Sequence, residues 1–196
     1  MARLGRQLDH FDLINLNTIR ADFSPDQKHR YTLQMDYLPD LLDSSRSETT
    51  TVILKNPSSA NEQRSDATIR KVETFVYKRF PKTKYLNILN IFAFRATDAI
   101  ELHQLMQSEG DAAGIGADNN DFFKKLLADS NELIFAWGGP SGIDKGIYGK
   151  RIADVKEIVA EHYSGQVYQV LGQKPTKEPL HGLMWGYEYD LIKISL

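Results

Sequence analysis

Residues that can bind or activate a ligand lie within or directly after three apolar runs of the sequence. They are Asn56 and Ser58 after the run 52–54, Asn90 and Arg95 within and after the run 88–92, and Trp137 with Gly138 after the run 133–136. A protein core requires none of these polar residues. An open parallel sheet binds ligands outside the carboxyl ends of its strands. The three segments therefore predict one shared site at a single edge of such a sheet.

Asn56 is the first candidate for chemistry, because it stands between an apolar run and Pro57. A residue before proline is held in an extended conformation, so the chain leaves the strand sharply. The amide of asparagine offers both an acceptor and a donor, and Ser58 adds a hydroxyl. Such a turn can bind a base edge or a phosphate, or hold a water nucleophile. The alternative is a loop in which Asn56 only satisfies backbone groups.

Two arginines are candidates for binding an anion. Arg70 follows Asp66 and Thr68 at an expected helix start, where free N–H groups and the helix dipole attract negative charge. Arg95 precedes a second expected helix cap at Thr97. Either guanidinium can clamp a phosphate or carboxylate through two hydrogen bonds. The alternatives are an exposed arginine on a capped helix for Arg70 and a loop-pinning salt bridge for Arg95.

Three further residues have both a functional and a structural interpretation. Asn90 interrupts an apolar strand, and an unpaired buried amide costs about 1–3 kcal/mol, so it bonds a neighbouring loop or reaches the site. Trp137 can stack on a base or fill the core. His181 is the best placed of the histidines for acid–base work, although a lone histidine is also commonly structural. No Ser-His-Asp order, phosphate-binding loop, dinucleotide motif or metal-ligand cluster is present.

The elements that position these residues alternate between strands and helices. Strand patterns cover 31–37, 51–54, 85–92, 132–137, 166–171 and the tail near 187–195. Helices are expected after a cap at Ser65 or Asp66, after Thr97 and Asp98, after Asp118, and around 152–162. This series predicts a three-layer α/β/α sandwich with a mainly parallel sheet and an antiparallel edge strand. Residues 1–29 are expected to form an N-terminal extension with some helix, and residues 30–196 a single domain.

Composition narrows the classes of protein. The chain has 196 residues, a net charge of −2 and no cysteine, which excludes disulfides and thiolate chemistry. It has no apolar run of the ~20 residues that a membrane helix needs and no signal-peptide pattern, so we predict a cytoplasmic protein without a membrane partner. A basic cluster between residues 64 and 84 is either a nucleic-acid contact or a solvated helix face. No cofactor or metal is predicted, and the oligomeric state is open.

Together these motifs resemble an uncharacterised family, the domain of unknown function 1643. The family pattern appears here as Asn-Pro-Ser at 56–58, Asp-Ala-Thr-Ile-Arg at 66–70, Asn-Ile-Phe-Ala-Phe-Arg-Ala-Thr-Asp at 90–98, Gly-Ala-Asp-Asn at 116–119, Trp-Gly at 137–138 and His-Gly-Leu at 181–183. The match spans roughly residues 30–185. Lys55 stands where the family is usually apolar. Gly182 replaces a proline, which is expected to loosen the loop of His181.

The layout of that family is distantly similar to uracil-DNA glycosylases, which carry a polar Asn-Pro or Asp-Pro turn after the first core strand and a late histidine loop. This resemblance implies that Asn56 positions or activates water and that His181 stabilises the departing base. Ser58, Thr68, Asn90, Thr97, Trp137 and Gly138 would then complete the ligand contacts, with Arg70 and Arg95 holding phosphates.

Three hypotheses of function follow from the sequence. The first is a protein that recognises a nucleobase, nucleotide or nucleic acid, with N-glycosidase activity as its chemistry. The second is a non-catalytic binding module for a small anionic metabolite or nucleotide, which needs the arginines but no catalytic group. The third is an interaction scaffold that uses the aromatic tail at Trp185, Tyr187 and Tyr189.

Overall fold

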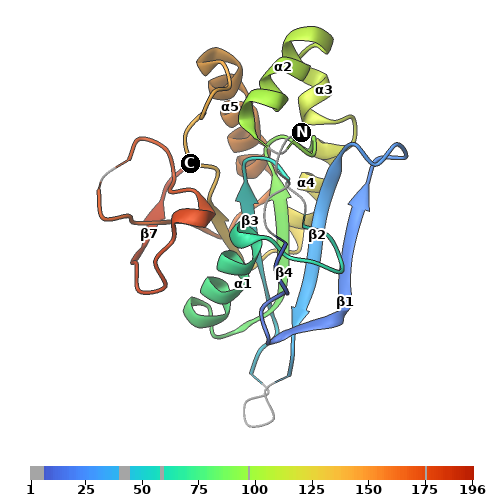
Figure 1. The fold of residues 1–196 in the computed structure, drawn as a ribbon. Coiled ribbons are helices and arrows are strands. Elements are labelled where there is room, and N and C mark those ends of the chain that lie inside the picture. Colours follow the sequence, from blue (N-terminus) through green and yellow to red (C-terminus); the bar gives the residue numbers. More distant parts are fainter. Residues whose placement is uncertain (1–6, 40–44, 58–59, 97, 175) are drawn as a thin grey trace.

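A seven-stranded mixed sheet forms the centre of the molecule (Figure 1). The computed structural model describes residues 7–39, 45–57, 60–96, 98–174 and 176–196. The strands are β1 (Ile14–Phe23), β2 (Arg30–Tyr37), β3 (Glu48–Leu54), β4 (Thr83–Asn90), β5 (Glu132–Phe135), β6 (Gln166–Val170) and β7 (Leu191–Ile194). Their order across the sheet is β1-β2-β4-β3-β5-β6-β7.

The centre of the sheet is parallel and both of its edges are antiparallel. Strands β4, β3, β5 and β6 run in the same direction, whereas β1, β2 and β7 pair antiparallel with their neighbours. The α/β class and the parallel core agree with the prediction from sequence, and antiparallel pairing extends to three strands rather than one. The carboxyl ends of the four parallel strands share one edge of the sheet, which is the edge where ligands bind in such folds.

The N-terminal segment differs from its prediction, because residues 14–23 form the edge strand β1 and not a helix. Its two buried isoleucines, Ile14 and Ile19, are an odd number of positions apart, so a regular strand would point them to opposite faces of the sheet. A register shift between Asn15 and Arg20 brings both to the core side. This bulge breaks the two-residue alternation by which a strand is recognised in a sequence.

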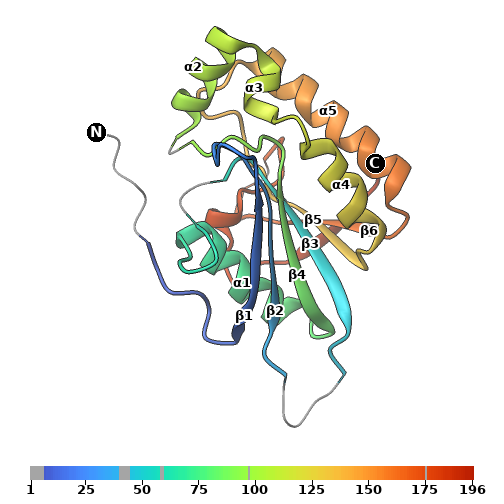
Figure 2. The same ribbon diagram turned by 90° about the vertical axis from the view of Figure 1, so that its right-hand side faces the viewer.

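Helices cover both faces of the sheet (Figure 2). They are α1 (Ala67–Arg79), α2 (Ala99–Glu109), α3 (Asp111–Ile115), α4 (Asn119–Ala128), α5 (Lys145–His162) and the short 3-10 helix η1 (Gly182–Met184). Asp66 and Asp98 cap α1 and α2 through two backbone N–H groups each, as the sequence predicts. Asp118 takes the cap position of α4 without a side-chain hydrogen bond. The short α3 follows α2 directly, with Gly110 between them.

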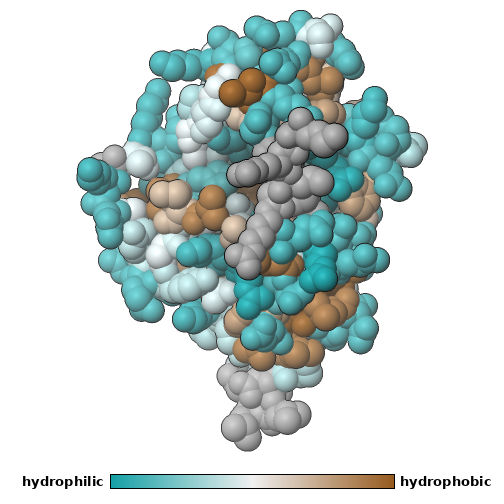
Figure 3. All heavy atoms as spheres, viewed as in Figure 1, coloured by the Kyte–Doolittle hydropathy of each residue, from teal (hydrophilic) through white to brown (hydrophobic). Residues whose placement is uncertain are grey.

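Two hydrophobic cores lie on opposite faces of the sheet. Helices α2, α4 and α5 pack on one face, around Phe123, Phe135 and Trp137. Helix α1 and the C-terminal segment pack on the other face, around Phe75 and Trp185. The surface in the view of Figure 1 is mostly hydrophilic and is interrupted by separate hydrophobic patches (Figure 3). Among the described residues, no helix combines the length and the apolar character that crossing a membrane requires.

Candidate functional site

A small polar cavity, here called the inner pocket, lies beside the carboxyl end of β3. Its volume is about 160 Å³. The residues that line it are Arg30, Leu54, Asn56, Asp66, Thr68, Ile69, Ala96, Asp98 and His181. They come from the start of β2, the end of β3, the first turn of α1, the cap of α2 and the loop before η1. The fold therefore brings distant segments to one point at the predicted edge of the sheet.

A larger hollow, here called the outer groove, adjoins the inner pocket and shares His181 with it. Its volume is about 630 Å³. It is formed by residues 138–140 after β5, the first turns of α5 with Lys145 and Tyr148, and the loop 176–181. Leu180 and Met184 make part of its wall apolar. His181 therefore stands at the boundary between a polar pocket and a partly apolar groove.

Asn56 is held firmly in the inner pocket. Its Nδ2 donates hydrogen bonds to the carbonyl oxygens of Ala96, at 3.1 Å, and Pro57, at 3.3 Å. These bonds fix the orientation of the amide and leave Oδ1 as its remaining acceptor. Among the described residues, none donates a hydrogen bond to that oxygen. Asn56 can therefore offer a fixed acceptor to a ligand or a water.

His181 is held in one tautomer by its own loop. Its Nδ1 accepts a hydrogen bond from the backbone N–H of Leu183 at 3.2 Å, so the proton of the neutral ring resides on Nε2. Burial and the nearby charge of Lys55 lower the pKa of His181 to about 4, against a smaller opposing effect of Asp66. The ring is therefore neutral at physiological pH, with Nε2–H as a donor.

The loop of His181 is tied to the end of β5 by two backbone hydrogen bonds. Gly138 N–H donates to Pro179 at 3.0 Å, and Gly182 N–H donates to Ala136 at 3.3 Å. Gly138 has φ +68°, and a Cβ there would lie 2.8 Å from the Cβ of His181. The expectation that Gly182 loosens this loop is wrong. Gly182 is buried, and it makes a hydrogen bond that proline cannot make.

The structure brings four of the sequence-predicted site residues to these cavities. Asn56, Thr68 and His181 line the inner pocket, and Gly138 lines the outer groove. Ser58 and Thr97 lie outside the described residues. The four others, Arg70, Asn90, Arg95 and Trp137, do not line either cavity.

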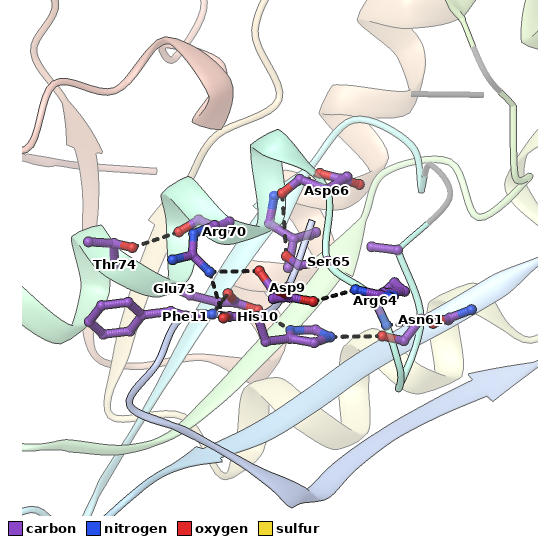
Figure 4. Close-up of polar contacts among 12 residues, drawn as sticks. Asp9, His10, Phe11, Asn61, Arg64, Ser65, Asp66, Arg70, Glu73 and Thr74 are labelled. Atoms are coloured by element: carbon purple, nitrogen blue, oxygen red, sulfur yellow. Dashed lines mark hydrogen bonds and ion pairs between the residues drawn. The ribbon is translucent and has the colours of Figure 1, made fainter. Parts of the chain in front are cut away.

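Each of those four side chains has a different environment. Arg70 donates to the carbonyl oxygens of Asp9 and His10, so its guanidinium faces the N-terminal segment (Figure 4). Arg95 donates to Gln27 O in the turn between β1 and β2. Asn90 and Trp137 are fully buried.

Burial explains why two of these residues do not reach a ligand. Trp137 packs its ring 4.3 Å from that of Phe135, centroid to centroid, and has no exposed face for stacking. Asn90 also has no exposed surface, and its side-chain amide has no hydrogen-bond partner among the described residues. Its backbone carbonyl accepts a hydrogen bond from Asn119 at 3.0 Å. The local sequence pattern does not distinguish these core positions from a site.

Sequence reasoning missed the role of two buried cations, of which Arg30 lines the inner pocket and Lys55 acts on the charge of His181. Arg30 is 1% exposed and lines the inner pocket, and burial lowers its pKa to about 10. Lys55 is 6% exposed, and its Nζ donates to Ser141 Oγ at 3.1 Å. Burial lowers the pKa of Lys55 as well. For Lys55, the signal in the sequence was an unusual lysine directly after an apolar run. For Arg30 there was no signal, because nothing in the local sequence shows that it is buried.

No metal centre accompanies these residues in the part of the chain that the structure describes, where no three His, Asp or Glu side chains come together to hold an ion. The polar groups in and around the two cavities are a neutral histidine, a fixed amide, two buried cations and two capping carboxylates.

The fold and the site define an α/β protein with a polar pocket at the carboxyl edge of a mixed sheet. A family model described as protein of unknown function DUF1643 matches residues 30–183, and the chain belongs to this family. No curated protein and no solved structure matches the chain. The comparisons thus give no support to the likeness with uracil-DNA glycosylases.

Proposed function

We propose that this protein recognises a nucleotide at the carboxyl edge of its sheet and cleaves its N-glycosidic bond. The observation that carries this proposal is the pairing of Asn56 and His181 in the inner pocket. Each side chain is fixed by the protein through one polar group, and each has a second polar group without a partner among the described residues. Asn56 offers Oδ1 as an acceptor, and His181 offers Nε2–H as a donor.

Hydrolysis of an N-glycosidic bond uses a donor and an acceptor in this way. The bond from the sugar C1′ to the base nitrogen breaks, and its electron pair leaves with the base. Nε2–H of His181 donates a hydrogen bond to the departing base and stabilises its negative charge. Oδ1 of Asn56 accepts a hydrogen bond from the water whose oxygen forms the new bond to C1′. The proton that the water loses passes to the base or to solvent.

The position of His181 between the two cavities fits this reaction. The outer groove, with Tyr148, Leu180 and Met184, offers apolar and aromatic surface to a base. The inner pocket offers polar groups to a sugar. A substrate that extends from one cavity into the other places its glycosidic bond beside His181. The Asn-Pro turn and the late histidine loop occur in the same chain order as in uracil-DNA glycosylases, which supports the proposal at the level of sequence alone.

The experiment is an assay of free-base release by the full chain. Substrates are nucleosides, nucleoside monophosphates, and single- and double-stranded DNA containing uracil or damaged bases. Replacing Asn56 by Ala should lower the rate about 10²–10³-fold, because a preorganised polar group is lost. His181→Ala should lower it as well, because the donor to the departing base is lost. Asn17→Ala, which changes an exposed asparagine on β1, is the matched control and should keep the wild-type rate.

A second candidate is a non-catalytic module that binds a small anionic metabolite or nucleotide. The carboxylates of the inner pocket favour it. Asp66 and Asp98 each accept two backbone N–H groups as helix caps, so both carboxylates already have a structural role. Absence of base release by the wild-type protein from every substrate would contradict the N-glycosidase and leave this candidate.

A further inference from the structure

We propose that the inner pocket binds a phosphate group and that Arg30 is its main contact. This inference builds on the proposed function, because it identifies the substrate as a nucleotide that carries a terminal phosphate. It also assigns a role to a residue that belongs to none of the sequence-predicted contacts.

Arg30 is a buried cation without a counter-ion. It is 1% exposed, and its guanidinium forms no ion pair with a carboxylate among the described residues. A guanidinium has five N–H donors. Among the described residues, this guanidinium makes one hydrogen bond, from Nη1 to the carbonyl oxygen of Ala60 at 2.5 Å, and its Nε is buried without a partner. Buried charges in proteins are normally paired, so a guanidinium with donors left over suits an anionic ligand.

The neighbouring charges act on Arg30 in both directions. The negative charges of Asp66 and Glu62 favour its charged form, and the positive charge of Arg95 disfavours it. Asp66 and Asp98 also line the pocket, where each carboxylate accepts two backbone N–H groups as a helix cap. None of these residues forms an ion pair or a hydrogen bond with the guanidinium among the described residues, so its Nε keeps a donor for a ligand.

A second donor of the pocket suits the oxygens of a phosphate. Thr68, on the first turn of α1, lines the same cavity as Arg30. Hydrogen bonds from a guanidinium and a hydroxyl reach different oxygens of a tetrahedral group, and arginine can bind two of them at once. The pocket volume of about 160 Å³ accommodates such a group.

Arg151 provides a matched comparison inside the same protein. It is also buried, its Nε donates to a backbone carbonyl, that of Ile91, at 2.6 Å, and its Nη2 lacks a partner. Burial lowers its pKa to about 10, as for Arg30. Arg151, however, lines neither the inner pocket nor the outer groove. The two arginines differ in access to a ligand and not in burial.

The test is thermal unfolding of the full chain with inorganic phosphate, ribose 5-phosphate, a nucleoside monophosphate, its nucleoside, or acetate at equal ionic strength. The three phosphates should raise Tm of the wild type by about 5–10 °C at roughly 100 times Kd. Arg30→Met should abolish this rise and keep or increase Tm without ligand, because an unpaired buried cation is replaced by an apolar side chain of similar length. Arg151→Met should keep the phosphate-dependent rise.

A second measurement keeps the proposal testable if a variant fails to fold. Wild-type protein should broaden the ³¹P resonance of inorganic phosphate, and ribose 5-phosphate should compete. No rise in Tm together with no broadening would overturn the proposal, as would an unchanged rise in Arg30→Met or a larger rise with acetate than with phosphate.

These outcomes separate this inference from the proposed function. Phosphate-dependent stabilisation without base release would overturn the N-glycosidase and support the phosphate site. Equal base release from nucleosides and nucleotides, with no effect of phosphate on Tm, would support the N-glycosidase and overturn the phosphate site.

Discussion

The charge state of His181 is set by the residues around it. Burial lowers its pKa most, and the positive charge of Lys55 acts in the same direction. Lys55 is itself buried and hydrogen-bonded to Ser141, so its charge stays close to the imidazole. A histidine in such surroundings is a neutral hydrogen-bond donor and does not act as an acid that gains and loses a proton near pH 7.

We therefore predict that His181 stays neutral in the folded protein from about pH 5 to about pH 8. Its folded pKa of about 4 is below its unfolded value, so protons bind the unfolded state preferentially and the free energy of unfolding falls as the pH drops below about 6.5. Imidazole ¹⁵N NMR should show the Nε2–H tautomer throughout this range. Lys55→Met should raise the pKa. The urea-unfolded chain is the control, and a folded midpoint near 6.5 would contradict the prediction.

Helix α1 is anchored by the segment before β1 (Figure 4). The carboxylate of Glu73 accepts a hydrogen bond from Phe11 N–H at 2.8 Å and contacts His10 Nδ1 at 2.5 Å. Arg70, one turn earlier, donates to two backbone carbonyls of the same segment. Because the first turn of α1 carries Asp66 and Thr68, these contacts also hold one wall of the inner pocket in place.

The His10–Glu73 pair should make the stability of this helix dependent on pH. Burial lowers the pKa of His10, but the hydrogen bond and the charge of Glu73 outweigh it, so the net pKa is raised above 6.5. A raised pKa means that the pair stabilises the fold fully below about pH 6.5, and that this stabilisation is lost as the pH rises through the folded pKa. Both side chains are fully buried.

Glu73→Gln should therefore lower the free energy of unfolding by about 3–5 kcal/mol at pH 6, and by less at pH 9. Urea denaturation at both pH values measures this difference. The matched control is Lys124→Gln, which breaks an exposed ion pair with Asp121 that is worth about 0–1 kcal/mol. Equal destabilisation by Glu73→Gln at pH 6 and pH 9 would show that the pair does not titrate as described.

At the scale of the whole molecule, one sheet joins two cores. Each strand of the parallel centre contributes side chains to both faces: Val52 and Leu54 of β3 pack towards α1, and Ile53 packs towards α4 and α5. Neither helical layer can bury its apolar face without the sheet. Loss of one core therefore removes the support of the other.

This arrangement predicts a single cooperative unfolding transition. The chain has two tryptophans, one in each core, which makes the prediction measurable. Trp137→Phe leaves Trp185 as the reporter of the α1 face, and Trp185→Phe leaves Trp137 as the reporter of the other face. In each variant, urea curves from fluorescence and from far-UV circular dichroism should coincide. Separate midpoints in either variant would mean that the cores unfold independently.

The sequence by itself determined the features that depend on short stretches of chain. The alternation of residues 31–37 indicated β2, and the aspartates at 66 and 98 indicated the caps of α1 and α2. The placement of Asn56 after an apolar run also predicted its position at the carboxyl edge of the sheet, where it lines the inner pocket. Strand alternation, helix caps and the direction of parallel strands are local or topological rules, so they can be read without coordinates.

Only the tertiary structure decided which polar residues are buried, paired or available. It placed Arg30 in the inner pocket, Trp137 in the core and Arg70 on the N-terminal segment. The sequence had suggested a ligand contact for Trp137 and Arg70, and none for Arg30. It also turned residues 14–23 into an edge strand through a bulge. Burial, charge compensation and hydrogen-bond partners depend on segments far apart in the chain, and no local pattern specifies which of these segments will meet.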